Sequence, residues 1–163
     1  MEPLRPAETV IADARRIAAE VGARLAALLP AHELTLTGGS SVPGALTKGD
    51  VDLHLTVAPA DFAATVTALR ALYRVVHPEI WQDTLATFAV DAQLPTGIAV
   101  TPAGSEHDHR FRRAWELLRA DPALLAEYNA MKAGSAAGYE ERKSAFFTRL
   151  VSGPGPRAAR PPG

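Results

Sequence analysis

Cysteine is missing from this chain of 163 residues. Its absence excludes disulfide bonds and zinc sites built on thiolates. A basic excess is missing as well, because 17 Lys and Arg residues are set against 18 Asp and Glu residues. Strong binding to the phosphate backbone of nucleic acid requires such an excess, so the composition argues against that class of partner.

Long apolar runs and recognisable targeting segments are also missing. No stretch is long and apolar enough to cross a membrane, and the first residues lack the charged-then-apolar order of a secretory signal. We therefore expect a cytoplasmic protein with no membrane association. The G-x-S-x-G and Walker patterns are absent too, which removes the corresponding hydrolase and P-loop hypotheses. No pattern in the sequence indicates an oligomeric state.

The chain does contain enough sequence for one domain with an apolar core, since 47% of its residues are hydrophobic. We place this domain at residues 1–152. Residues 153–163 are rich in Pro, Gly and Arg and have no apolar period. Such a segment buries too little surface to offset the entropy of ordering it, so we predict a disordered tail there.

The order of helical and strand-like patterns predicts an α+β fold. The patterns predict helices over 9–29, 59–72, 107–120, 122–132 and 139–151, and strands over 34–37, 51–57, 73–76, 84–91 and 97–101. This order lacks the regular alternation of a doubly wound parallel sheet. It favours a small mixed β-sheet with helices packed on one face and a helical C-terminal part.

The stretch from residue 34 to residue 57 carries the strongest functional signal. Gly38 and Gly39 follow the first predicted strand, and glycines let a turn approach an anion such as a triphosphate. Asp50 and Asp52 open the next strand, where a spacing of two places both carboxylates on one face. A carboxylate pair beside such a turn is what a Mg²⁺–nucleotide site needs. A hairpin with two solvated acids gives the same short pattern, so the motif alone leaves both interpretations open.

This stretch resembles the GrpB-like family of the nucleotidyltransferase superfamily. That family typically carries G-S-T-S-V-P-G, then A-K-P, then an apolar strand with an aspartate. The matching residues here are Gly38-Gly39-Ser40-Ser41-Val42-Pro43-Gly44, Lys48 and Asp52. Matches in the predicted C-terminal helices are Arg119-Ala120-Asp121-Pro122, Glu127-Tyr128, Met131-Lys132, Tyr139, Lys143 and Phe146. The resemblance covers most of the chain and implies a nucleotidyltransferase-like fold.

The resemblance also implies roles for these residues. In the superfamily a glycine-rich turn holds the nucleotide phosphates, and an acidic pair binds a divalent metal ion. The residues of the turn in this chain are Gly38, Gly39, Ser40 and Ser41. Asp50 and Asp52 would then bind Mg²⁺ or Mn²⁺. The implied reaction moves a nucleotidyl group from a nucleoside triphosphate to a small-molecule acceptor, which the sequence does not identify.

A third carboxylate often completes the metal site of the superfamily, and this chain departs from the family there. The family usually has a His-Leu-His strand before A-G-S, whereas the matching stretch Gly97-Ile98-Ala99-Val100-Thr101 carries neither histidine nor acid. Asp91, at the end of the preceding predicted strand, is the candidate third metal ligand; an ordinary turn aspartate is the alternative. Asp50 is also a departure from the family, because GrpB-like proteins usually have an apolar residue at that position. With this aspartate, the chain is more similar to the catalytic pattern of the superfamily than many GrpB-like proteins are.

Three more residues are candidates for the site. His54 shares the strand face of Asp52 and is a candidate catalytic base or metal ligand. Lys48 precedes the two acids, and Lys143 falls in the matched Y-x-x-x-K-x-x-F pattern, so both are candidates for binding nucleotide phosphates. The plainer interpretations are a half-exposed strand histidine and solvated surface lysines.

The segment around residue 107 offers a second cluster of titratable residues. Ser105 is predicted to cap the helix that follows it. His107 and His109 are two residues apart and do not share a helix face, so we expect them and Asp108 to form a solvated helix start.

Other functions stay open beside nucleotidyl transfer. The missing His-Leu-His strand favours a non-catalytic module that binds a nucleotide or another anion, and a protein-interaction module of the same fold is a third hypothesis. Asp50 favours the enzyme. Fold alone does not decide between these functions.

Overall fold

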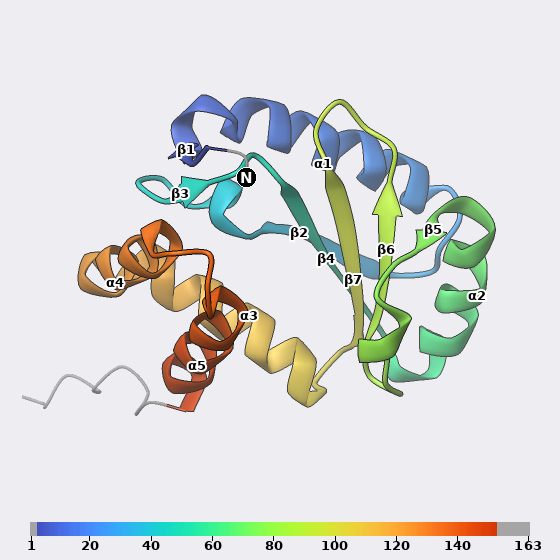
Figure 1. Cartoon of the computed structure of the whole chain (residues 1–163). Helices are drawn as coiled ribbons and strands as arrows, with labels where there is room; N and C mark the ends of the chain where they lie inside the picture. Colours follow the sequence, from blue (N-terminus) through green and yellow to red (C-terminus); the bar gives the residue numbers. More distant parts are fainter. Residues whose placement is uncertain (1–2, 153–163) are drawn as a thin grey trace, which may run out of the picture.

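The computed structural model describes residues 3–152 (Figure 1), and the tail predicted over 153–163 lies outside the described residues. The helices are α1 (Ile11–Ala26), α2 (Phe62–Leu72), α3 (Glu106–Ala120), α4 (Pro122–Ala133) and α5 (Tyr139–Ser152). The strands are β1 (Arg5–Pro6), β2 (His32–Thr37), β3 (Leu46–Thr47), β4 (Val51–Val57), β5 (Arg74–Val75), β6 (Ala86–Val90) and β7 (Thr96–Pro102). Short 3-10 turns cover Ala7–Thr9, Gly39–Ser41, Pro59–Asp61 and Pro78–Ile80.

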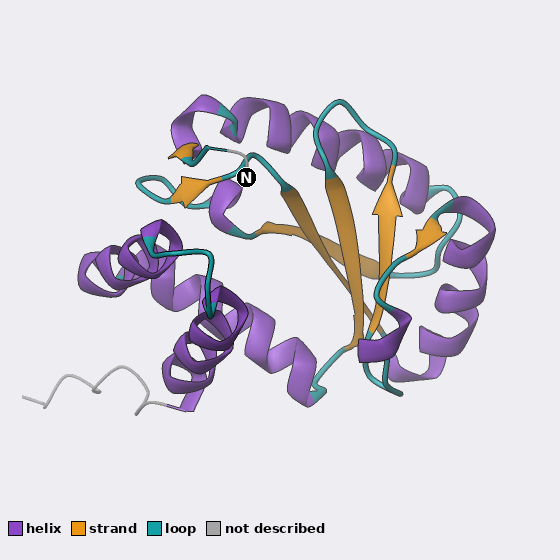
Figure 2. Cartoon of the chain, viewed as in Figure 1, coloured by secondary structure: helices purple, strands orange, loops and turns teal. Residues whose placement is uncertain are grey.

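The main sheet is five-stranded and mixed, with the order β2-β4-β7-β6-β5. β4 pairs in parallel with β7, and the other neighbours are antiparallel. β1 and β3 form a separate two-stranded ribbon. The helices surround the mixed sheet in Figure 2, so the predicted α+β class is confirmed. The sequence does not reveal the small ribbon, because two-residue strands carry no alternation that a pattern can detect.

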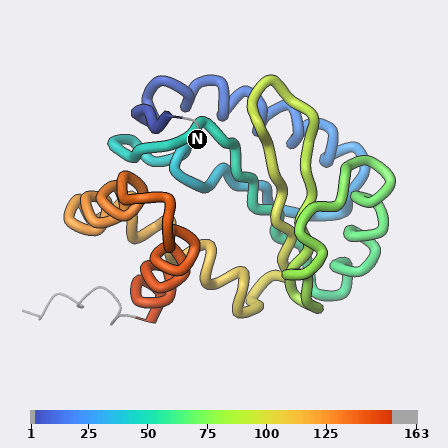
Figure 3. The backbone as a smooth tube through the Cα atoms, in the orientation of Figure 1, coloured from blue at the N-terminus to red at the C-terminus, as the bar shows by residue number. Residues whose placement is uncertain are grey.

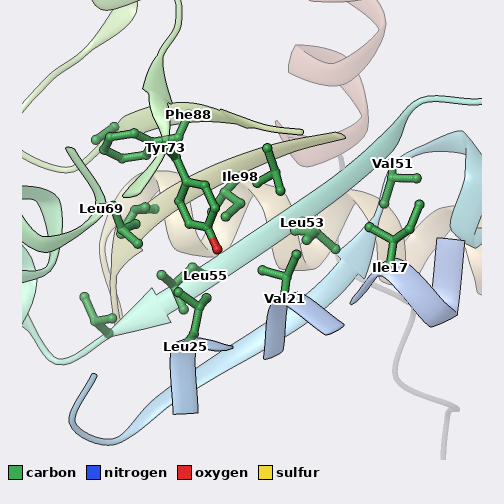
Figure 4. Packing of buried hydrophobic residues seen from close by; sticks show 14 of the residues in the cluster. Ile17, Val21, Leu25, Val51, Leu53, Leu55, Leu69, Tyr73, Phe88 and Ile98 are labelled. Atoms are coloured by element: carbon green, nitrogen blue, oxygen red, sulfur yellow. The ribbon is translucent and has the colours of Figure 1, made fainter. Parts of the chain in front are cut away.

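One face of the sheet packs on α1 and α2 and forms the main core. β4 alternates, so that its odd-numbered residues face this core. Figure 4 shows the packing of side chains from α1, α2 and the central strands, among them Ile17, Val21, Leu25, Leu53, Leu55, Leu69, Phe88 and Ile98. The first helix, predicted over 9–29, is shorter in the structure, where α1 covers Ile11–Ala26. Leu28 follows the end of α1 and is 53% exposed.

The helices α3, α4 and α5 form a second packing unit beside the other face of the sheet. Figure 3 follows the chain from β7 into these helices. Their buried side chains form a second cluster with residues of the N-terminal part: Ala7, Val42, Ala45, Ala114, Leu118, Tyr128, Phe146 and Leu150. Trp115 and Phe147 flank Tyr128 in ring contacts. The even-numbered residues of β4 therefore lie between the sheet and the C-terminal helices.

No helix within residues 3–152 combines the length and the apolar character that spanning a membrane requires.

Candidate functional site

The glycine turn and the acidic strand meet where β2 passes into the turn Gly39–Ser41. Thr37, the last residue of β2, pairs with Asp52 on β4. Gly38 follows with φ +76°, a left-handed conformation that favours glycine. A Cβ atom at Gly38 would collide with the Asp52 carboxylate. The turn therefore requires glycine both for its backbone and for the close approach of Asp52.

Asp50 and Asp52 form a pair of interacting negative charges at the start of β4. Both side chains are accessible to solvent. The surrounding protein nevertheless partly desolvates the Asp52 carboxyl, and this desolvation is the main cause of its raised pKa. The negative charge of Asp50 is the second cause and also raises the pKa. Lys143 and Lys132 act in the opposite direction and lower that pKa. The net effect is a carboxylate whose charged form is disfavoured in the folded protein.

Three lysines place positive charge beside the two acids. The Lys48 ammonium lies over the ring of Tyr139, 5.7 Å from its centroid. The Lys132 ammonium lies over the ring of Tyr128, 5.6 Å from its centroid. Partial burial lowers the pKa of Lys132, and the nearby charge of Lys143 lowers it further. The sequence singles out Lys48 and Lys143 as the phosphate-binding candidates; Lys132, which lies in the matched Met131-Lys132 dipeptide, is not one of them.

The serines of the turn use their hydroxyls inside the protein. Ser40 is fully buried; its Oγ donates to the Asp50 carbonyl at 2.5 Å and lies 2.9 Å from Thr47 Oγ1. Ser41 Oγ donates to the Gly38 carbonyl at 2.7 Å. Arg119 from α3 donates to Ser41 Oγ at 3.2 Å. These contacts fix the turn against the loop that carries Asp50, so the serines shape the site instead of pointing their hydroxyls outward.

Gly39 is the point where the turn touches the C-terminal helices. A Cβ atom there would lie 3.0 Å from the Tyr128 hydroxyl and 3.0 Å from the Leu46 carbonyl. Nearby, the Asn129 side chain accepts from the Leu46 amide at 2.8 Å and donates to the Gly44 carbonyl at 2.8 Å. These contacts hold α4 against the loop between β2 and β4.

His54 lies on the same strand face as Asp52 but is only 2% exposed. Its Nε2 atom lies 2.7 Å from Thr101 Oγ1 and 3.5 Å from Asp108 Oδ1. The ring also packs against Phe111, with centroids 5.2 Å apart. Burial lowers the pKa of His54 to about 4, so the imidazole is neutral at neutral pH. The structure therefore places this candidate base beneath α3 and not at the open surface beside Asp52.

Asp108 is the centre of the buried polar network around His54, and the prediction of a solvated helix start is wrong for this residue. It is 4% exposed. Its Oδ1 accepts from Thr56 Oγ1 at 3.0 Å and from Arg112 Nε at 3.0 Å. Arg112 also forms an ion pair with Glu33, in which Arg112 Nη2 and Glu33 Oε2 are 2.9 Å apart. The spacing of Asp108 and Arg112 by one helical turn was the available signal, because it places both on one face of α3.

The third carboxylate is not found beside Asp50 and Asp52. Among residues 3–152, no three His, Cys, Asp or Glu side chains gather in a group that could hold a metal ion. Asp91 is exposed just after β6, and β7 separates β6 from β4. The residue paired with Asp52 on β7 is Gly97, which has no side chain to contribute.

A mixed sheet of this topology, with a glycine turn beside an acidic strand and a helical C-terminal part, is nucleotidyltransferase-like. The chain belongs to the GrpB family, because the family model described as GrpB protein matches residues 12–152. It is 29% identical over 132 residues to a UPF0157 protein of Vibrio cholerae serotype O1, covering 78% of this chain and 70% of that protein.

A solved structure with the same fold is that of the conserved protein GrpB from Enterococcus faecalis. Its TM-score to this chain is 0.69 at 14% sequence identity. The match covers 91% of this chain and 94% of that one. At this identity the similarity establishes the fold alone.

Proposed function

We propose that this protein binds a nucleoside triphosphate together with Mg²⁺ or Mn²⁺ at Asp50 and Asp52 and transfers its nucleotidyl group to a small-molecule acceptor. The observation that carries the proposal is the contact between the Gly38 turn and the Asp52 carboxylate, with Asp50 beside it. This arrangement brings the backbone of the glycine turn and two carboxylates to one point of the sheet.

The two carboxylates suit a divalent cation. Mg²⁺ is commonly held by one or two carboxylates, with substrate phosphates and water as its other ligands. The raised pKa of Asp52 fits this assignment, because a nearby cation would favour the ionised form that burial and Asp50 disfavour. When bound, the metal would neutralise negative charge on the phosphates. Asp91 has no comparable support, because it does not group with the pair.

The other residues of the site would bind and orient the nucleotide. Lys143 is exposed and its charge reaches Asp52, so it can contact a triphosphate held beside that carboxylate. The buried Ser40 fixes the position of the Asp50 backbone, and Gly38 keeps the space over Asp52 free of a Cβ atom. Fixed geometry of this kind favours transfer, since positioning and charge stabilisation dominate phosphoryl chemistry. His54 would act through the packing of α3, because it is buried away from this surface.

Calorimetric titration with ATP, with and without Mg²⁺, tests the proposal. We expect Mg²⁺ to raise the affinity for ATP and Asp52→Asn to remove most of that gain, because the amide keeps the shape of the side chain and removes its charge. Asp83→Asn is the matched control, since Asp83 is an exposed aspartate in the segment before β6. Equal ATP binding by wild type and Asp52→Asn would end the metal assignment.

A second function, nucleotide or anion binding without transfer, is favoured by one observation. Gly97 occupies the strand position opposite Asp52, where a third carboxylate would otherwise complete the site. Pyrophosphate release separates the two functions. Sustained release from Mg²⁺–ATP with hydroxyl or phosphate acceptors supports transfer, whereas tight binding without release over a broad set of acceptors supports the binding module.

A further inference from the structure

A cavity of about 620 Å³ opens next to the lysines of the site. It lies between the N-terminal segment, the loop before β4 and the connection from α4 to α5. Leu4, Ala136 and the half-buried ring of Tyr139 form apolar parts of its wall, and Lys48 and Lys132 contribute positive charge. Glu140 and Glu141, in the first turn of α5, also line the cavity and contribute negative charge on that side. Its volume is within the range of sites that enclose a small molecule.

The two lysines connect this cavity to the acidic pair. Lys48 is two residues before Asp50 in sequence, and the charge of Lys132 acts on Asp52. Within the described part of the chain, neither ammonium forms an ion pair; each lies over a tyrosine ring instead. Lys143 does not line the cavity. A ligand in the cavity would therefore place an anionic group against Lys48 and Lys132 at the end nearest Asp50 and Asp52.

We propose that this cavity holds the acceptor, and that the acceptor is a phosphomonoester with an apolar or aromatic body. This inference rests on the proposed function. The acceptor phosphate lies against Lys48 and Lys132, and its body packs on Tyr139 and Leu4. A phosphate oxygen attacks the α-phosphorus of the triphosphate and forms a new P–O bond, while the bond from that phosphorus to the oxygen of the β-phosphate breaks. Pyrophosphate leaves with that oxygen, and the product contains a diphosphate linkage.

The nucleoside of the triphosphate is the competing occupant of the cavity, and the position of the lysines argues against it. The α-phosphate is the phosphate nearest the ribose. A nucleotide whose base filled the cavity would place that phosphate at Lys48 and Lys132 and its terminal phosphates near Asp50 and Asp52. Nucleotidyl transfer at the carboxylates needs the α-phosphate there instead. An acceptor meets both requirements, since its anionic group borders the acids while its body stays in the cavity.

Phenyl phosphate is a suitable probe, because it joins a phosphomonoester to a flat apolar ring. We expect wild-type protein to bind it about fivefold or more tightly than inorganic phosphate in calorimetric titrations without metal. Tyr139→Ala should remove most of this difference, and Tyr139→Phe should keep it. Lys132→Ala should weaken phenyl phosphate binding about fivefold or more. Arg149→Ala is the matched control, because Arg149 is exposed on α5 and does not line the cavity, and it should leave phenyl phosphate binding unchanged.

The outcomes separate this inference from the proposed function. Equal binding of phenyl phosphate and inorganic phosphate, or an unchanged preference in a folded Tyr139→Ala, would overturn the acceptor assignment. Competition between Mg²⁺–ATP and phenyl phosphate, together with weaker ATP binding in Tyr139→Ala, would assign the cavity to the nucleoside and also overturn it. Retained phenyl phosphate binding in Asp52→Asn supports the inference. If that variant also keeps full Mg²⁺–ATP binding, the proposed metal site alone fails.

Discussion

Asp52 is a residue whose surroundings disfavour its charge. Its pKa is raised in the folded protein, chiefly because the surrounding protein partly desolvates its carboxyl, and next by the charge of Asp50. The folded state therefore binds the proton more readily than the unfolded state. Above the folded-state pKa, the charged Asp52 lowers the free energy of unfolding. This loss of stability disappears as the pH falls through that pKa. We predict that Asp52→Asn raises the melting temperature at pH 7. Differential scanning calorimetry measures this, with Asp83→Asn as the exposed control; a lower melting temperature for Asp52→Asn would contradict it.

Lys143 is a residue whose proposed role concerns binding and not folding. It is exposed on α5, while Phe146 and Leu150 anchor that helix in the second cluster. We predict that Lys143→Ala weakens nucleotide binding by about 1–3 kcal/mol, the range for a hydrogen bond to a charged group. The melting temperature should change little. Arg149→Ala, an exposed position on the same helix, should leave affinity unchanged, and equal affinities for all three proteins would exclude Lys143 from the site.

The sequence predicts some of these residues well and others poorly, for physical reasons. The spacing of Asp50 and Asp52 and the glycine before them predict their proximity, because strand alternation and turn chemistry are local properties. The burial of Asp108 and His54 depends on where α3 crosses the sheet, and that is a long-range property. Lys132 joins the site for the same reason, since the packing of α4 against the loop of Gly39 and Leu46 positions it.

The turn after β2 is the element whose conformation the site depends on most directly. Gly38→Ala should cost about 1–2 kcal/mol for the left-handed conformation alone. It should also displace the Asp52 carboxylate, which occupies the position of the new methyl group. Gly104→Ala is the matched control, because Gly104 has φ +78° with no atom within 4 Å of a Cβ. Chemical denaturation should therefore show a larger loss for Gly38→Ala, and equal losses would contradict the close approach.

His54 is a buried, neutral imidazole in the interface between α3 and the sheet. The groups that face it are Asp108, Arg112 and Glu33. Because its pKa falls from 6.5 to about 4 on folding, the unfolded state binds the proton first as the pH drops. His54 therefore does not reduce the free energy of unfolding above pH 6.5. As the pH falls from 6.5 toward 4, this free energy decreases by up to about 3 kcal/mol through His54.

We therefore predict that the free energy of unfolding falls less steeply between pH 6.5 and pH 4 in His54→Gln than in the wild type. Urea denaturation across this range measures the slope. The same substitution at the exposed His109 should leave the wild-type slope unchanged, because that side chain is outside the network. Parallel slopes for His54→Gln and the wild type would show that His54 does not titrate as the burial implies.

β7 is the strand on which the third carboxylate of the expected metal site is missing. Gly97 pairs with Asp52, and a Cβ there would contact only the Phe88 carbonyl, at an ordinary 3.6 Å. We predict that Gly97→Asp adds a carboxylate beside Asp52 and lowers the Mg²⁺ concentration needed for half-maximal ATP binding. Gly97→Asn is the control without the charge. A Mg²⁺ requirement that is the same in both variants would argue against a metal ion at this position.

On the scale of the whole molecule, the site lies where two packing units meet. The core on one face of the sheet holds β4 in place, and the helices α4 and α5 carry Lys132 and Lys143 to the other face. The strong periodicities of the long elements predict the α+β class and the helical C-terminal part. The cavity by Tyr139 is not predictable from the sequence, because segments as distant as Leu4 and Lys132 line it together.

The central claim is that the Asp50–Asp52 pair holds a metal–nucleotide complex against the Gly38 turn. Paramagnetic broadening by Mn²⁺ in amide NMR spectra with ATP present locates that complex most directly. We predict selective loss of the signals of 38–41 and 50–52, and recovery of those signals in Asp52→Asn. Broadening centred elsewhere on the sheet, or unchanged broadening in the variant, would contradict it.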